Sequence, residues 1–371
     1  MKNIIDFHVP FSGFTTVDFI NCFTSVFMFI ENVELPAVGD YECAKAEGKP
    51  CNGCGNCGKG GKTPFSVQEA YFFLFDTICG RSSLRRRFDG TLTEMQKWIG
   101  ETESDGCGTD ATVDFLFGFA GYEYIKLTGA TKFKDAVIAS VDSGKPVIAK
   151  VKTGNGRFRV ITGYDGDSLF CPDYNNAQQR PEKDPVYDDI EIIYIIGNKT
   201  PPRYTLTDCL ERIVRVMEFN TKEDLWGAYK GMLGWYAFRN PGMENAPLEE
   251  RKARMKRVAD TMWHTFNCHN FAEVFRNCRD NKDFYINISD MKRLYGAEFT
   301  ELCNTISGPC HGYTHDLAWS MIDIEKQIDW QKLIYPCGIA EMVELTIARI
   351  ETNDINALDT IKQILAILQG K

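Results

Sequence analysis

The sequence predicts an α+β domain followed by an all-helical domain. Short β-branched runs alternate with Gly-containing turns between residues 147 and 171, which is typical of an antiparallel meander. Beyond residue 199, apolar residues recur at helical spacing. Pro201 and Pro202 follow the last strand-like run and disfavour its continuation. We therefore expect domains at 1–198 and 199–371, each long enough for its own core.

Each element of the first domain has a local signal. The meander is expected to contain neighbouring strands at 147–151 and 157–161, a turn at 163–165 and a third strand at 168–171. Helices are predicted at 18–31, 66–79, 109–119 and 132–142, and further strands at 122–127 and 190–196. In the second domain, Thr207 or Asp208 is expected to cap a helix that runs to Phe219.

Composition excludes some partners. The formal net charge of -9 argues against a broad nucleic-acid-binding surface. The most apolar run, 19–30, has 12 residues, which is short of the roughly 20 that a membrane-spanning helix needs. The N-terminus lacks the pattern of a signal peptide, so we expect a cytoplasmic protein whose 14 cysteines are reduced thiols or metal ligands.

Cys22 is the first candidate for chemistry. It lies near the start of the predicted helix at 18–31, where unpaired backbone N–H groups and the helix dipole would stabilise a thiolate. Those N–H groups would also stabilise an oxyanion, and Asn21 would add an amide donor. Alternatively, Cys22 is a small apolar residue that packs the helix into the core.

This layout resembles the papain-like cysteine hydrolase and acyltransferase superfamily. The resemblance rests on the helix that bears Cys22, upstream of a strand meander introduced by Gly144-Lys145-Pro146. It is nearest to the double-glycine-leader peptidases and to the butirosin-biosynthesis acyltransferase type, in which a helical domain follows the papain-like one. The resemblance implies that Cys22 attacks an amide or a thioester. It also implies that Asp173 orients the catalytic base, and that the substrate is an acyl group on a small molecule or a carrier protein.

The sequence departs from that family at the base. The position of the catalytic His holds Arg157, and a guanidinium stays protonated and does not act as a general base. Thr16 stands where the oxyanion-hole Gln is usual. Two functions therefore stay open: acyl transfer or hydrolysis through Cys22, and a catalytically degenerate domain that binds a ligand or partner. In either, Arg157 is a candidate anchor for an anionic group.

A cysteine cluster follows the first helix. Cys43, Cys51, Cys54 and Cys57 lie in a Gly-rich insertion at 40–62, with two successive gaps of two residues. Such gaps allow thiolates to converge on Zn²⁺ or an iron–sulfur cluster. The alternative is a reduced loop with no metal.

Two further groups have more than one interpretation. The imidazoles of the second domain are either core residues or a second metal site or base; they are His264, His269, His311 and His315. The basic run Arg85-Arg86-Arg87 is a solvated turn, the partner of an internal carboxylate, or a phosphate site.

Overall fold

The structure is a computed structural model of an α+β protein with helices and antiparallel sheets. It describes residues 2–11, 18–35, 64–85, 87, 91–100, 106–129, 132–152, 158–172, 186–225, 247, 249–250, 348, 351–352, 354–355, 358–359, 361–363, 365–366 and 368–370.

Two compact units make up the chain. Unit 1 contains Met1–Cys79, Trp98–Leu206 and Asp280–Gly296, and unit 2 contains Gly80–Lys97, Thr207–Arg279 and Ala297–Lys371. The chain thus leaves unit 1 after Leu206, and the segment Gly80–Lys97 groups with residues that are distant in sequence.

A four-stranded antiparallel sheet forms the centre of unit 1. Its strand order is β2-β7-β3-β4, with β2 at Tyr122–Thr128, β7 at Ile190–Lys199, β3 at Val147–Val151 and β4 at Phe158–Ile161. Ile148 of β3 lies opposite Val160 of β4 on one side and Tyr194 of β7 on the other. The predicted pairing of the strands near 147–151 and 157–161 is confirmed.

The predicted third strand at 168–171 is confirmed at residues 168–170, but the predicted turn at 163–165 is wrong. Residues 163–165 form a strand, β5 (Gly163–Asp165), which pairs with β1 (Lys2–Ile4) and β6 (Ser168–Phe170) in a separate three-stranded sheet. At Gly163, a Cβ atom would lie 2.7 Å from the Asn3 carbonyl oxygen. Only glycine allows β1 to approach so closely. Gly163, which suggested a turn in the sequence, is therefore required for the contact between β5 and β1.

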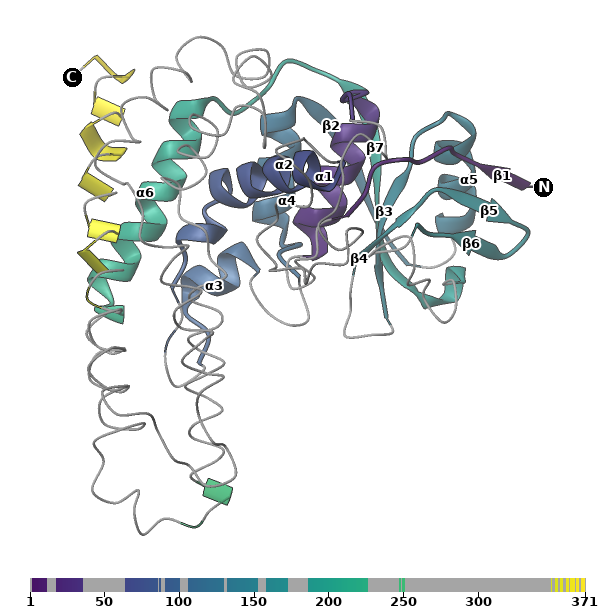
Figure 1. The fold of residues 1–371 in the computed structure, drawn as a ribbon. Coiled ribbons are helices and arrows are strands. Elements are labelled where there is room, and N and C mark those ends of the chain that lie inside the picture. The colour runs from purple at the N-terminus through teal and green to yellow at the C-terminus, as the bar shows by residue number, and fades with distance from the viewer. Residues whose placement is uncertain are drawn as a thin grey trace, which may run out of the picture. The chain divides into compact units, whose positions relative to one another are not determined.

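Helices cover both faces of the four-stranded sheet (Figure 1). On one side lie α1 (Asp18–Ile30), α2 (Pro64–Ile78) and α4 (Asp110–Ala120), and on the other lies α5 (Phe133–Asp142). Strand residues alternate between the two faces. Ala149 and Ile193 pack in the core beside α5, whereas Tyr194 contacts Phe19 of α1.

The proline-containing segment after β7 is packed onto α4 rather than extended away from it. The N–H groups of Thr200 and Arg203 donate to the carbonyls of Gly121 and Gly118. A Cβ on Gly118 would lie 2.6 Å from the ring of Tyr204, so the missing side chain makes room for that ring.

Unit 2 contains α6 (Leu206–Lys222) apart from its first residue. The helix begins before Thr207 and Asp208, so the predicted cap is wrong and these residues lie in its first turn. The helical spacing of Leu210, Ile213, Val214 and Met217 predicts one apolar face, and the structure buries Leu210, Ile213 and Met217 but leaves Val214 partly exposed. The described residues between Ala348 and Leu368, called here the C-terminal helical segment, are also helical.

The short helix α3 (Glu94–Ile99) was not predicted. Within the described ranges, no helix is long and apolar enough to cross a membrane.

Candidate functional site

Cys22 lies one turn inside α1. It is the fifth residue of this helix, and its side chain has 0% exposure. Only the first four N–H groups of a helix lack an intrahelical acceptor, and in α1 the N–H of Phe19 already donates to the Gly106 carbonyl at 2.9 Å. The N–H of Cys22 therefore belongs to the helical ladder and is not an oxyanion donor. The helix dipole also weakens beyond the first turn.

Asn21 is part of a buried, uncharged network. Gln68 Nε2 donates to Asn21 Oδ1 at 2.9 Å and to Ser25 Oγ at 3.2 Å, and Ser25 Oγ donates to the Pro10 carbonyl at 2.7 Å. Asn21, Ser25 and Gln68 all have 0% exposure. We call these three residues the Asn21–Gln68–Ser25 network. It links α1 to α2, and the side-chain oxygen of Asn21 is the acceptor on α1 for the Gln68 amide.

Helix α1 packs on the strand that was predicted to start with Arg157. The ring of Phe19 makes edge contacts with Phe158 of β4 at 5.2 Å and with Tyr194 of β7 at 5.5 Å between centroids. The helix that bears Cys22 is thereby fixed against β4. Arg157 and Asp173 themselves lie outside the described residues.

The one histidine that the structure describes stands near the far end of α1. The His8 ring lies 5.8 Å from the ring of Phe29, and its Nδ1 lies 3.4 Å from the Asp6 carbonyl. Phe29 is seven residues beyond Cys22, which corresponds to about 10 Å along a helix. This position gives no support to His8 as a base for Cys22. His264, His269, His311 and His315 fall outside the described ranges.

Two residues beside the candidate site were missed in the sequence. Gln68 gave no signal because its partners are 47 and 43 residues away. Cys107 is buried and has a positive φ of 65° in the loop that accepts the Phe19 N–H through Gly106. The Gly-Cys-Gly run before the Thr109 cap of α4 is the signal that would have located this loop.

The predicted metal ligands Cys43, Cys51, Cys54 and Cys57 lie outside the described residues. In the part of the chain that the structure does describe, no three or more His, Cys, Asp or Glu side chains are grouped so that they could hold a metal ion.

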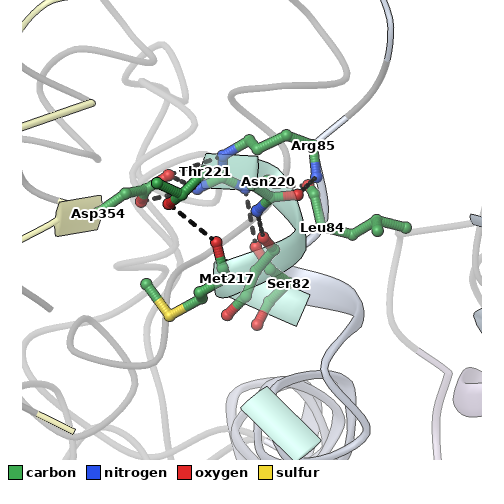
Figure 2. Close-up of polar contacts among 8 residues, drawn as sticks. Ser82, Leu84, Arg85, Met217, Asn220, Thr221 and Asp354 are labelled. Carbon is green, nitrogen blue, oxygen red and sulfur yellow. Dashed lines mark hydrogen bonds and ion pairs between the residues drawn. The ribbon is translucent and has the colours of Figure 1, made fainter. Parts of the chain in front are cut away.

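The basic run contains a buried ion pair (Figure 2). Arg85 Nε and Nη2 donate to Asp354 Oδ2 and Oδ1, both at 2.9 Å, and the side chains are 2% and 9% exposed. Burial raises the pKa of the Asp354 carboxyl above its ordinary value, and Arg85 opposes that rise. The internal-carboxylate interpretation is thus confirmed for Arg85. Arg87 pairs with Glu223 at 2.9 Å on the surface.

The chain was compared with known proteins by sequence. No protein-family model matches it, and no curated protein matches it.

Proposed function

We propose that this chain is a ligand- or partner-binding protein built on a papain-like scaffold that has lost the catalytic step. The observation that carries the proposal is the position of Cys22, which is completely buried and lies one turn inside α1. A nucleophilic thiol needs solvent access and a microenvironment that favours the thiolate. Cys22 is completely buried, and the side chain of the preceding residue, Asn21, belongs to an uncharged hydrogen-bond network.

The distribution of histidines along the sequence supports the same proposal. Catalysis through a thiol needs a proton acceptor within about 3 Å of the sulfur. The sequence has no histidine between His8 and His264, and His8 packs against Phe29. Arg157 replaces the family's histidine and keeps its proton at any pH that the fold tolerates.

The proposed ligand is anionic and its proposed anchor is Arg157. A guanidinium binds a carboxylate through two parallel hydrogen bonds. Arg157, which stands in place of the general base, would therefore bind the anionic ligand instead. The ligand class is a small carboxylate, or the acidic surface of an acyl carrier, met in the cytoplasm.

The binding test uses succinate as the probe and thermal stabilisation of the full chain as the readout. Succinate is expected to raise the Tm of the wild-type protein and of Arg159→Ala, which removes a guanidinium from β4, two residues beyond Arg157 in the sequence. The rise should disappear in Arg157→Ala. Equal stabilisation of all three proteins would remove Arg157 as the anchor.

The turnover test compares the thiol in folded and unfolded protein. Iodoacetamide is expected to label Cys22 only after unfolding, as measured by peptide mass spectrometry, because the folded side chain is buried. An acetyl-thioester probe should stay intact with wild type and with Cys22→Ala alike. Labelling of the folded chain together with Cys22-dependent thioester cleavage would contradict the proposal.

Acyl transfer or hydrolysis through Cys22, with Asp173 as an orienting residue and Asn21 as an amide donor, is the second candidate. The contact of Phe19 with Phe158 favours it, since a papain-like site also sets its cysteine helix against the strand meander. This candidate predicts the opposite outcome in the turnover test.

We also propose that Cys43, Cys51, Cys54 and Cys57 bind one Zn²⁺ or an iron–sulfur cluster that closes the Gly-rich insertion; the spacing of the four thiols supports this. Elemental analysis of protein purified without chelator is expected to find zinc or iron. Cys54→Ser should lower that content, whereas Cys171→Ser, outside the cluster, should not. Metal-free protein would leave only the loop interpretation.

A further inference from the structure

The C-terminal helical segment lies beside α6, and we call the regularly spaced buried residues of the two helices the seam. The buried described residues of the C-terminal helical segment are Asp354, Leu358 and Ile361, at intervals of four and three residues. Among the seven buried residues of α6, Ile213, Val216 and Asn220 stand at intervals of three and four, and Val216 and Asn220 also contact the segment that contains Gly80 and Arg85. Alternation of three and four residues is the spacing of helix pairs that interdigitate along their length.

The two helices run in opposite directions. Lys362 Nζ lies 2.6 Å from Glu218 Oε1, and Gln369 Nε2 donates to Glu211 Oε1 at 2.8 Å. Residue numbers therefore rise along one helix as they fall along the other. Glu211 and Glu218 are seven residues apart on α6, and their partners Gln369 and Lys362 are also seven residues apart.

One layer of the seam is polar (Figure 2). Asp354 and Asn220 occupy positions that the spacing reserves for apolar residues, and Arg85 lies between them. Asn220 Oδ1 accepts the Arg85 backbone N–H at 3.3 Å, while its Nδ2 donates to the Ser83 carbonyl at 2.7 Å. Arg85 Nη1 donates to the carbonyls of Ser82 and Leu84.

Polar and apolar layers respond differently to a shift of one helix along the other. A shift of one heptad, about 10 Å, in the direction that brings Leu365 and Leu368 to the places of Leu358 and Ile361 replaces apolar residues by apolar residues. The same shift would separate Asp354 from Arg85 and leave each buried charge without the opposite charge. Arg85 keeps its proton and therefore stays charged when it is buried, so the shifted state is strongly disfavoured.

We propose that the layer of Arg85, Asn220 and Asp354 is a register lock, which holds the C-terminal helical segment in one alignment on α6. The charges reduce stability relative to an apolar layer and in exchange exclude shifted alignments. A single buried polar residue fixes the register of some coiled coils in this way.

The chain carries its own reporter of this register. Carbodiimide couples a lysine to a carboxylate that it contacts, and Lys362 contacts Glu218. Glu211 lies one heptad before Glu218 on α6, and Glu223 lies near the other end of that helix. In wild type, the Lys362–Glu218 cross-link is expected to dominate in peptide mass spectrometry.

The decisive variant is the double substitution Arg85→Met with Asp354→Leu. It should fold with a Tm equal to or above that of wild type, yet divide the Lys362 cross-links between Glu218 and either Glu211 or Glu223. Ile361→Val, which alters an apolar layer of the same seam, should keep the wild-type cross-link. A double variant with only the Lys362–Glu218 cross-link would overturn the proposal.

The double substitution Arg85→Gln with Asp354→Asn keeps the test decisive if the apolar double variant does not fold. It retains polar side chains of similar shape at both positions while it removes both charges. We expect a detectable fraction of cross-links to Glu211 or Glu223 in this variant as well. Their absence at a signal equal to wild type would equally rule out the lock.

Discussion

Two buried polar networks connect helices in this protein, one in each compact unit. In unit 1, the Asn21–Gln68–Ser25 network joins α1 to α2, and in unit 2, Asn220 and Asp354 meet Arg85. Both are nearly inaccessible to water. They differ in charge: the first contains amides and a hydroxyl, whereas the second contains a complete ion pair.

That difference separates two uses of buried polar groups. A thiol becomes a nucleophile when a neighbouring cation or base stabilises its thiolate. The network beside Cys22 supplies neither, so it fits a helix-packing role. The charged layer fixes an alignment instead, because a buried charge tolerates only the arrangement that pairs it.

The largest expected effect comes from removing one partner of the ion pair. Arg85→Met and Asp354→Leu should each lower the free energy of unfolding by about 3–5 kcal/mol, because each leaves a buried ionisable group without the opposite charge. Denaturant titration measures both. A loss below that of an exposed ion pair would show that the pair is not buried in solution.

The pH dependence distinguishes these two variants. Burial raises the pKa of Asp354, and without Arg85 that pKa rises further. In Arg85→Met, stability should therefore be greater at acidic pH, where Asp354 is neutral, and fall as pH rises through the raised pKa. In Asp354→Leu, Arg85 stays charged throughout, so the cost should not vary with pH for this reason.

Local patterns in the sequence predicted the elements, and their long-range partners escaped prediction. Helix α1 and strand β3 follow from apolar periodicity within one segment, and both were placed correctly. The insertion of β7 between β2 and β3 and the pairing of β1 with β5 were missed, because neither leaves a signal within its own segment. The six residues of α3 are too few for a helical period to be visible.

The same limit applies to the candidate site. The sequence located Cys22 on the first helix, but its role depended on how far inside the helix it lies and on burial by other elements. Gln68 is 47 residues from Asn21, and Asp354 is 269 residues from Arg85. The sequence shows that such residues are polar, but which of them contact one another depends on the folded structure.

A smaller effect is expected in the uncharged network. Gln68→Met keeps the side-chain length but removes the amide that donates to Asn21 and Ser25, leaving their buried oxygens without that donor. The cost should be about 1–3 kcal/mol by denaturant titration, below that of Arg85→Met. Gln369→Met is the matched control, since its amide bonds to Glu211 at an exposed site. Equal losses in the two glutamine variants would contradict the buried network.

Arg87 offers a smaller effect still, from within the same basic run as Arg85. Its side chain is 42% exposed where it meets Glu223, and exposed ion pairs contribute about 0–1 kcal/mol. Arg87→Ala should therefore change stability by less than about 1 kcal/mol, and the change should vanish in concentrated salt. A cost comparable to that of Arg85→Met would mean that sequence position, rather than burial, sets the energetics of this run.

The smallest expected effect concerns Asp142 in unit 1, whose shift is opposite to that of Asp354. Its Oδ1 accepts hydrogen bonds from Asn3 Nδ2 at 2.9 Å and from Tyr164 Oη at 2.8 Å, and these bonds lower the pKa of Asp142. A lowered folded-state pKa adds stability above the ordinary Asp value of about 3.9, and that stability is lost as pH falls through the folded-state pKa.

Asn3→Ala should raise the pKa of Asp142 towards its ordinary value, as measured by carboxyl NMR titration. Lys134→Ala, which removes the partner that lowers the pKa of Asp167, should shift Asp167 and leave Asp142 unchanged. Should both variants move both carboxyls, the cause would be the general charge of unit 1 rather than the two hydrogen bonds to Asp142.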